Sequence, residues 1–456
     1  ADIVDGKGGT DTLNARYSVS ADSTQTATVS NVERIFIDTD DGDANDAHTT
    51  TFDLATFSGV TQAWASNNDS DATNQDILNI TNIPLGTTVG VKGGDANANN
   101  TFTYLLTTAL TDTATLALDT AKSDLITIAG IEAITVSASG KSTIDELATT
   151  SALTLNVNAT GKTVLTNIDD ATRVVDAAGS TGAVTIGGVG TYSKGLTITG
   201  GSGNDTIKMG TTLDKLDTIV GGEGIDTLLT SADANTAGMG AGVSGFEVFG
   251  LSTTDADDTM RMDTIDVSEF YLVNADSNDN GTAFTTTFTK ADNGDNITIY
   301  AASDDSDDNS EGTLLTVTHA VDSSSDDISV TLAGIGASAY TSGADALGSG
   351  IDTVTLSNAE TVNIVSNASA TNAAITKNSI DLLVPTVGKA INISGTTNLR
   401  ITDIGSTPST LLSIDASALD AKLELYGVDA TGTALGGNTI KLAGKNSTLS
   451  MTGLNV

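Results

Sequence analysis

Two nonapeptides near the middle of the chain limit what this sequence can fold into more than any other feature. Residues 200–208 read GGSGNDTIK and residues 221–229 read GGEGIDTLL. Both match the pattern G-G-x-G-x-D-x-U-x at every constrained position, U being a large aliphatic residue. The glycines allow a tight backbone turn, and the aliphatic residue anchors the short strand that follows in a core. The two copies predict stacked turns of a β-solenoid.

The same nonapeptides supply oxygen ligands. Backbone carbonyls at the glycine turn and the carboxylate of the aspartate form the kind of donor set that Ca²⁺ prefers. The copies begin further apart than the roughly 18 residues of a coil made of two nonapeptides, and the segment 209–220 lacks paired glycines. We expect one or two calcium sites that use Asp205 and Asp226, with Asp217 as a weaker candidate. The expected carbonyl ligands are those of Gly201, Gly203, Gly222 and Gly224.

Further acidic segments are candidates for the same ion. Residues 6–13 (GKGGTDTL) form a partial third copy, and residues 38–43 and 255–258 are acidic loops at corresponding places of an internal repeat. Residues 276–281 (DSNDNG) match the first half of an EF-type loop, but Thr287 stands where a bidentate glutamate is needed. Each loop either binds an ion or keeps strand edges soluble by its charge. The candidate ligands here are Asp11, Asp41, Asp43, Asp255, Asp257, Asp276, Asn278 and Asn280.

The rest of the chain has the period-two pattern of short β-strands. Segments such as 153–157 (LTLNV), 297–299 (ITI) and 423–425 (LEL) alternate apolar and polar residues between turn residues. No long stretch has the 3.6-residue period and the caps of a helix. No apolar run approaches the roughly 20 residues of a membrane-spanning helix. The sequence predicts an all-β chain, an elongated parallel β-helix or β-roll solenoid with calcium-binding turns and no membrane insertion.

Internal repetition divides the chain. Residues 141–145 (KSTID) recur as 377–381 (KNSID) at an offset of 236, and residues 51–57 (TFDLATF) match 264–270 (TIDVSEF) at an offset of 213. Ordered matches with a slowly growing offset indicate a tandem duplication with small insertions. We therefore expect two β-solenoid halves, 1–198 and 199–456, the second of which begins with the nonapeptides.

A shorter theme occurs four times: a turn, a glutamate and an alternating strand, as in 30–37 (SNVERIFI) and 244–251 (SGFEVFGL). The glutamate has two interpretations. It is either a carboxylate that accepts backbone N–H groups at a corner of the coil, which satisfies otherwise unpaired donors, or a metal ligand. The four residues are Glu33, Glu132, Glu247 and Glu360.

The charge of the chain is strongly acidic: 58 acidic residues against 19 basic ones give a formal charge of −39. Such a chain repels polyanions at long range, and phosphate binding needs clustered Lys and Arg. Nucleic-acid binding is therefore excluded, and cations are the expected partners. Cysteine is absent, so stability has to come from packing, strand ladders or metal sites without sulfur.

The sequence also argues against catalysis. Its two histidines, His48 and His319, belong to no H-E-x-x-H pattern, and no G-x-S-x-G elbow occurs. With 58 acidic residues, a close pair of carboxylates says nothing about acid–base chemistry. The single Trp64 and seven tyrosines give little material for a sugar-stacking cleft. We expect a protein without enzymatic activity.

The nonapeptides resemble RTX repeats, the calcium-binding β-roll elements of proteins that Gram-negative bacteria export by type I secretion. The stretch from 224 (GIDTL) to Glu247 and its following strand, and the segment 391–419, resemble the surface-layer proteins of the Caulobacter type. The RTX similarity covers a few tens of residues, and the surface-layer similarity is spread over most of the chain. In that family the RTX part forms calcium-filled parallel β-coils that tile the cell surface. Clean repeats are fewer in this sequence, which leaves the number of ions open.

The resemblance implies a secreted structural protein of the extracellular cell surface, an S-layer protein, that binds Ca²⁺ and associates with copies of itself in a two-dimensional lattice. Because the first residues already run into a repeat, we expect a piece of a longer polypeptide, and contact with a cell-surface polysaccharide would use a region outside this chain. Two alternatives stay open. One is an RTX adhesin or surface-filament subunit, and the other is the non-catalytic calcium-binding carrier region of a larger RTX protein.

Overall fold

The computed structural model of the chain is a stack of parallel β-strands, a β-solenoid, which confirms the predicted fold class. Among the described residues no α-helix occurs, and no helix is long and apolar enough to cross a membrane. The structure describes residues 2–19, 21–41, 48–66, 77–106, 111–149, 151–169, 171–188, 195–210, 212–230, 242–252, 258–264, 267, 269–273, 285–300, 313–320, 324–333, 351–368, 377–387, 389–404, 413–429 and 439–452.

The chain divides into two compact units. The first comprises Ala1–Leu228 with Ala241–Phe246, and the second comprises Leu229–Gly240 with Glu247–Val456. Residue 198, where the sequence predicts the border between two halves, lies inside the first unit. The two halves are predicted from a repeat in the sequence, and the compact units do not test that repeat. The halves therefore stay a prediction.

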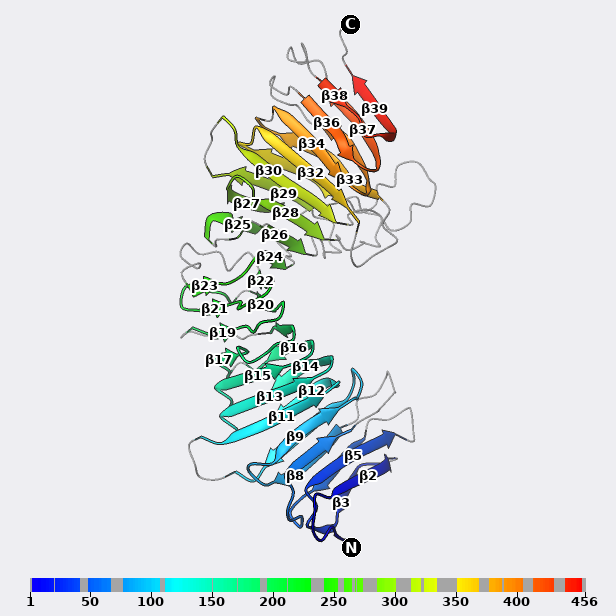
Figure 1. Cartoon of the computed structure of the whole chain (residues 1–456), viewed down its shortest axis with the longest axis vertical. Helices are drawn as coiled ribbons and strands as arrows, with labels where there is room; N and C mark the ends of the chain where they lie inside the picture. The colour runs from blue at the N-terminus through cyan, green and yellow to red at the C-terminus, as the bar shows by residue number, and fades with distance from the viewer. Residues whose placement is uncertain are drawn as a thin grey trace. The chain divides into compact units, whose positions relative to one another are not determined.

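The first unit is built from two sheets of parallel strands, shown from blue to green in Figure 1. One sheet has the order β2 (Thr12–Val19), β5 (Arg34–Asp41), β7 (Gln62–Ala65), β9 (Thr88–Lys92), β11 (Thr113–Asp119), β13 (Ala133–Ser139), β15 (Thr154–Ala159), β17 (Val174–Asp176), β19 (Thr197–Thr199), β21 (Thr218–Val220) and β23 (Val243–Ser244). The other pairs β3 (Ser23–Thr26), β6 (Thr49–Asp53), β8 (Ile77–Ile83), β10 (Asn99–Tyr104), β12 (Lys122–Ile128), β14 (Ser142–Ala148), β16 (Thr163–Ile168), β18 (Val184–Ile186) and β20 (Thr206–Gly210). A short ladder joins β1 (Ile3–Asp5) to β4 (Thr28–Ser30), and β22 (Thr227–Thr230) begins in this unit.

Consecutive strands mostly alternate between the two sheets, so one turn of the coil contributes a strand to each. In the register, Thr113 lies opposite Ala133, and Thr197 lies opposite Thr218, so the chain between such partners forms one turn. The two nonapeptides occupy the same corner of successive turns, and the segment between them forms the rest of one turn. Their spacing is therefore the length of a turn, which is longer than two nonapeptides.

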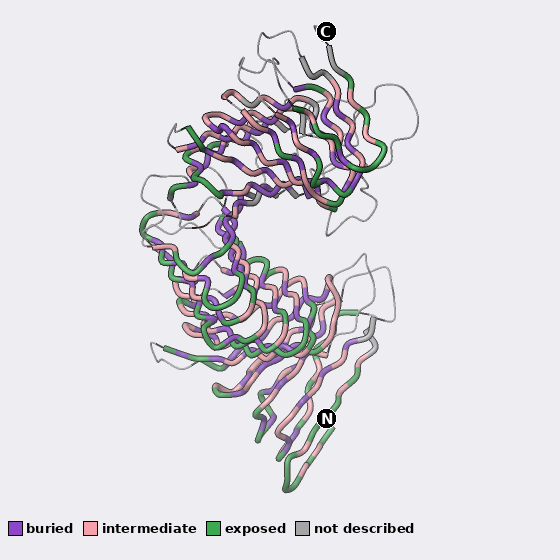
Figure 2. Tube along the Cα trace, turned by 45° about the horizontal axis from the view of Figure 1, so that its top comes forward, coloured by how far each residue is buried: buried purple, intermediate pink, exposed green. Residues whose placement is uncertain are grey.

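The core lies inside the coil and follows from the alternating pattern. Leu116, Val136 and Val157 occupy matching positions of β11, β13 and β15, and each is fully buried. Every second residue of a strand faces the core, and parallel strands pair in register. Matching positions of successive turns therefore form a column of aliphatic side chains. Figure 2 shows the same alternation of buried and less buried residues along the strands.

The second unit repeats this construction, and some of its turns are longer, such as the one from Asp327 to its partner Thr361. One sheet has the order β25 (Asp258–Arg261), β27 (Thr285–Ala291), β29 (Thr313–His319), β31 (Ile351–Ser357), β33 (Lys377–Pro385), β35 (Asn398–Ile404), β37 (Lys422–Asp429) and β39 (Lys445–Thr452). The other pairs β24 (Val248–Ser252), β26 (Glu269–Val273), β28 (Asn296–Tyr300), β30 (Asp327–Ala333), β32 (Thr361–Asn367), β34 (Ala390–Gly395), β36 (Ser413–Leu419) and β38 (Thr439–Lys441). The 3-10 turn η3 (Met262–Thr264) follows β25.

Candidate metal sites at the corners of the solenoid

Asp205 and Asp226 lie at one corner of the coil, each directly before a strand, β20 and β22. Asp205 Oδ1 accepts the backbone N–H of Val184 at 2.7 Å, and its Oδ2 accepts that of Gly201 at 2.6 Å. Asp226 Oδ1 accepts the N–H of Asp205 itself at 2.7 Å. Asp205 is 2% exposed and Asp226 is 0% exposed. Each aspartate thus satisfies a backbone donor of the turn before it.

Asp217 is built in the same way at the corner that precedes β21. Its Oδ1 accepts the N–H of Leu196 at 2.8 Å, and its Oδ2 accepts that of Asp214 at 2.7 Å. The residue is buried. The sequence ranks Asp217 below Asp205 because paired glycines are missing around it, yet both aspartates accept one N–H from the preceding turn and one from a residue three or four positions earlier.

Burial makes the ionised forms of Asp205 and Asp217 unfavourable. Desolvation raises the pKa of Asp205 above its ordinary value, although the N–H groups of Gly201 and Val184 oppose the shift. Desolvation also raises the pKa of Asp217 against the hydrogen bonds from Asp214 and Leu196, and the charge of Asp214 adds to the rise. A nearby cation would favour the ionised form of both groups.

The glycines of the nonapeptides stack directly on carbonyl groups of the neighbouring turn. A Cβ atom on Gly222 would collide with the carbonyl oxygen of Gly201, and one on Gly224 would collide with that of Gly203. Both Gly222 and Gly224 also have positive φ angles, 117° and 128°, which favour glycine. The carbonyls expected to be ligands therefore lie in close contact with the next turn, where the Gly201 oxygen also accepts the N–H of Glu223 at 3.0 Å.

Asp11, in the partial nonapeptide, offers a buried oxygen. Its Oδ2 has no hydrogen-bond partner among the described residues. A Cβ atom on Gly6 would lie 2.8 Å from this oxygen and would collide with the carbonyl oxygen of Asn31. A carboxylate oxygen and a carbonyl oxygen thus approach the same point at Gly6. Hard oxygen donors of this kind suit Ca²⁺, so the residues present fit the ion.

Three of the four repeated glutamates are corner carboxylates, as the first interpretation of the sequence predicts. Oε2 of Glu33 and of Glu132 accepts the backbone N–H of Asp11 and of Asp112, each at 2.7 Å. Glu360 Oε2 accepts the N–H of Asp326 at 3.1 Å. Glu247 is exposed. The glutamates and the aspartates therefore have the same structural role, which the separate motifs of the sequence do not reveal.

The remaining candidate ligands have no described side-chain contacts. Asp41 is the last residue of β5, and only its backbone is described. Within the described residues, no three Asp, Glu or His side chains form a group that could hold a metal ion. A cation at these corners would therefore draw on carbonyl or solvent oxygens besides one or two carboxylates. The candidates that lie outside the described residues are Asp43, Asp255, Asp257, Asp276, Asn278 and Asn280.

The second unit contains a buried group of titratable residues that the sequence patterns do not predict. His319 Nδ1 lies 3.7 Å from Asp326 Oδ2, and both side chains are almost fully buried. Asp295, also buried, accepts the N–H of Asp292 at 2.7 Å. Desolvation raises the pKa of Asp295 to about 6, and the nearby charges of Asp292 and Asp327 contribute to this rise.

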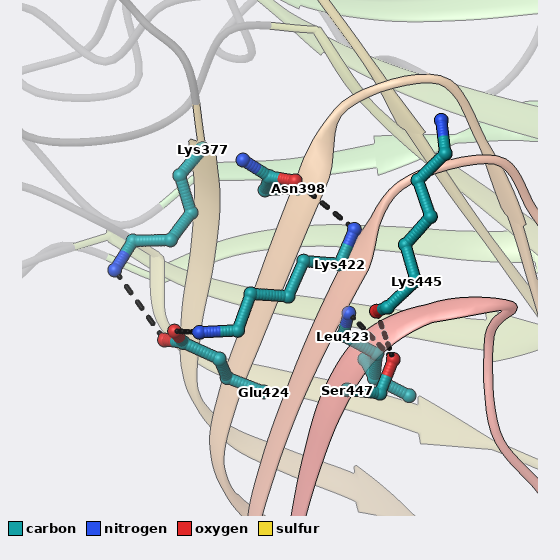
Figure 3. A network of polar contacts seen from close by, with 7 residues as sticks. All are labelled: Lys377, Asn398, Lys422, Leu423, Glu424, Lys445 and Ser447. Carbon is teal, nitrogen blue, oxygen red and sulfur yellow. Dashed lines mark hydrogen bonds and ion pairs between the residues drawn. The ribbon is translucent and has the colours of Figure 1, made fainter.

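Charge is distributed unevenly along the chain. Six of the 19 basic and six of the 58 acidic residues fall in 377–456, so this segment is neutral and the charge of −39 belongs to residues 1–376. Figure 3 shows one neutralised cluster, in which Glu424 contacts Lys422 Nζ at 2.6 Å and Lys377 Nζ at 3.5 Å. Burial raises the pKa of Glu424, but the two lysines outweigh it and lower the pKa below its ordinary value.

In comparisons with known proteins, no protein-family model and no curated protein sequence matches this chain.

Proposed function

We propose that this chain is a non-enzymatic, calcium-dependent structural protein that is secreted by a type I system and assembles with copies of itself into a surface layer on a Gram-negative cell. The observation that carries the proposal is the set of buried corner carboxylates, Asp205, Asp217 and Asp226, in a coil whose formal charge is −39. The β-solenoid fold is compatible with an RTX-like structural repeat.

The corner carboxylates couple cation binding to folding. Each accepts a backbone N–H of the preceding turn, so its position depends on how the turns stack. Their negative charges are buried inside an already acidic coil, where desolvation and mutual repulsion oppose compaction. Bound Ca²⁺ would supply the positive charge that offsets this repulsion. Asp205 and Asp226 would hold it at the nonapeptide corner, and Asp11 would hold it near Gly6.

The calcium concentration around the chain would then decide whether it is folded. Ligand binding to the folded form alone stabilises that form in proportion to the logarithm of the free ligand concentration. Weak, open calcium sites have dissociation constants of roughly 10⁻⁴–10⁻³ M. The low calcium concentration of the cytoplasm would leave the chain unfolded for export, and extracellular calcium would fold it at the cell surface and permit assembly.

A calcium titration of the full chain tests this proposal. We expect far-UV circular dichroism to gain β-structure on addition of CaCl₂, and light scattering and electron microscopy to detect particles that grow into ordered sheets. Addition of EGTA should reverse both changes, whereas MgCl₂ at equal ionic strength should reproduce neither. Unchanged dichroism and unchanged particle size after EGTA treatment would refute the calcium dependence.

A second candidate function, an adhesin or surface-filament subunit, is favoured by an aromatic groove on the first unit, formed around Phe36 next to Trp64. Micrographs of the native cell surface separate the two candidates. A regular two-dimensional array supports the lattice, and isolated fibres support the filament or adhesin.

A further inference from the structure

An open groove of about 480 Å³ lies on the first unit, on the sheet that contains β2, β5, β7 and β9. It is distinct from the glycine corners and contains none of the expected calcium ligands. The residues that line it are Asn14, Ala15, Arg16, Phe36, Asp38, Ser66 and Lys92.

Strand register arranges the groove as two rows of side chains on one face of the sheet. Asn14, Phe36, Trp64 and Gly90 are paired across the four strands and form the first row, of which Asn14 and Phe36 line the groove. The second row lies two residues further along each strand and contains Arg16, Asp38, Ser66 and Lys92. Because residues i and i+2 share a face of a strand, the two rows run side by side, about 7 Å apart.

The middle of the first row is aromatic. The rings of Phe36 and Trp64 stack with centroids 5.6 Å apart and an angle of 13° between their planes. The indole Nε1–H donates to Gln62 Oε1 at 3.2 Å, which fixes the ring. A Cβ atom on Gly90 would lie 2.5 Å from the Trp64 ring, so only glycine leaves room for the indole there. Both aromatic side chains stay partly exposed although they are large and apolar.

The second row is polar and locally neutral. Arg16 Nε lies 3.7 Å from Asp38 Oδ2, and Lys92 Nζ lies 3.0 Å from Asp119 Oδ2. Each cation of the rim thus has its own carboxylate, so the groove has no surplus positive charge for an anionic ligand, and the acidic chain repels anions at long range. Arginine and lysine donate hydrogen bonds, aspartate accepts them, and serine does both.

An aromatic wall beside alternating donors and acceptors matches the chemistry of a neutral sugar. The C–H face of a pyranose ring is apolar and packs on a flat aromatic side chain, and each hydroxyl both donates and accepts. A peptide matches less well. It would add to a sheet through free backbone groups at an edge, whereas this groove lies on the face of strands that are already paired on both sides from β5 to β9.

We propose that this groove is a binding site for a neutral oligosaccharide, in which Phe36 stacks on a sugar ring, Trp64 supports the Phe36 ring from the next strand, and Arg16, Asp38 and Ser66 bind hydroxyl groups. The site goes beyond the proposed calcium-dependent assembly and does not depend on it.

Trp64 makes the test direct because it is the single tryptophan of the chain. The full chain, in calcium-containing buffer, is titrated with cellohexaose, maltohexaose, laminarihexaose and chitohexaose while tryptophan emission is recorded. We expect a saturable shift with at least one of them. Loss of the ring in Phe36→Leu, which keeps an apolar side chain at this position, should weaken binding about tenfold, the equivalent of one stacking interaction.

Two variants keep the result interpretable. Trp64→Phe should remove the signal but retain binding measured by calorimetry, because an aromatic ring remains. Tyr426→Ala, which truncates a partly exposed aromatic residue of β37 that contacts Arg400, should leave binding unchanged. The proposal is overturned if no saccharide of the panel changes the emission or produces heat. It is also overturned if Phe36→Leu binds like the wild type, or if only an oligogalacturonate or a peptide binds.

Discussion

The carboxylate of Asp226 accepts the backbone N–H of Asp205, one turn earlier in the coil, at an N–Oδ1 distance of 2.7 Å. Asp205 makes the same contact to Val184 in the turn before. A carboxylate oxygen has more than one lone pair, so the atom that joins two turns can also face a cation. The proposed cation affinity would therefore depend on the same side chains as the stacking of the turns, and substitutions can separate the two roles.

Asp226→Asn and Asp226→Ala should separate charge from hydrogen bonding. The asparagine can still accept the N–H of Asp205, so in EGTA we expect the free energy of unfolding to stay near that of the wild type. The alanine leaves that buried donor unpaired and should lower it by about 1–3 kcal/mol. Both variants should lose part of the stabilisation that calcium gives, because both lack the carboxylate. Urea unfolding followed by circular dichroism, with and without calcium, measures all four values.

Asp176→Asn is the control for this pair, since Asp176 is exposed and accepts a local N–H, that of Ala178. It should retain the full calcium response. If Asp226→Asn also retained it, Asp226 would not be a ligand.

Glu132→Ala should destabilise the fold equally with and without calcium. Glu132 Oε2 accepts the N–H of Asp112 at 2.7 Å, and loss of this acceptor costs about 1–3 kcal/mol. Glu132→Gln keeps an acceptor and should cost less. Thermal unfolding in calcium and in EGTA measures the effect, and Glu146→Ala, at an exposed position of β14, should change stability by no more than about 0.5 kcal/mol. A larger loss in calcium than in EGTA would make Glu132 a metal ligand.

The strands and corners could be predicted from the sequence, but the length of a turn could not. Alternation along β15 places Leu155 and Val157 in the core, because a strand repeats every two residues, but Leu153, which continues the same pattern, lies just before the strand and is exposed. Loops absorb any number of residues between stacked strands, so the chain between Asp327 and its partner Thr361 is much longer than that between Thr113 and its partner Ala133. The acceptor role of Asp217 is hidden in the sequence for the same reason, since it depends on which residue of the preceding turn lies opposite.

The aromatic groove depends on register as well. Phe36 and Trp64 are far apart in the sequence, and no local pattern joins them. They stack because β5 and β7 pair in parallel with these two residues opposite each other. The sequence contains a single tryptophan and few other aromatic residues. Phe36 becomes a neighbour of Trp64 through the pairing of the two strands.

Gly221→Ala should disrupt the nonapeptide corner. Its Cβ would collide with the carbonyl oxygen of Gly245 and would lie 2.9 Å from the Cβ of Asp226. Overpacking of this kind costs about 1–3 kcal/mol, and we expect a lower midpoint of urea unfolding together with a weaker calcium response. Gly8→Ala, where no atom lies within 4 Å of the added Cβ, is the matched control and should behave like the wild type. Equal stability of the two variants would contradict the close stacking at this corner.

Stability without calcium should rise on mild acidification. The pKa of Asp295 is raised to about 6 in the folded chain, above its ordinary value of 3.8. Between these values the folded state binds more protons than the unfolded state, so the free energy of unfolding falls as the pH increases through this window. Burial of Asp205 and Asp217 acts in the same direction.

Urea unfolding in EGTA from pH 4.5 to pH 7.5 measures this dependence. For Asp295 alone, the predicted loss across the window is on the order of 2–3 kcal/mol. Asp295→Asn, which cannot ionise, should flatten the curve by that amount. A wild-type stability that increases toward pH 7.5 would show that the buried carboxylates of this chain are not desolvated in solution.

Removal of calcium should loosen the coil unevenly. Strands β19 and β21 follow directly on the corner residues Leu196 and Asp217, within the segment that carries the whole charge of −39. The segment 413–429, by contrast, belongs to the neutral end of the sequence, where Asp415 and Asp420 are paired with lysines at 2.7 Å and 2.8 Å. Hydrogen exchange read by mass spectrometry should therefore show that EGTA accelerates amide exchange in 196–228 more than in 413–429.

High NaCl concentration screens general repulsion between exposed charges but does not occupy a specific site. The difference between the two segments should accordingly persist in NaCl if ions bind at the corners, and it should vanish there if diffuse charge alone is responsible.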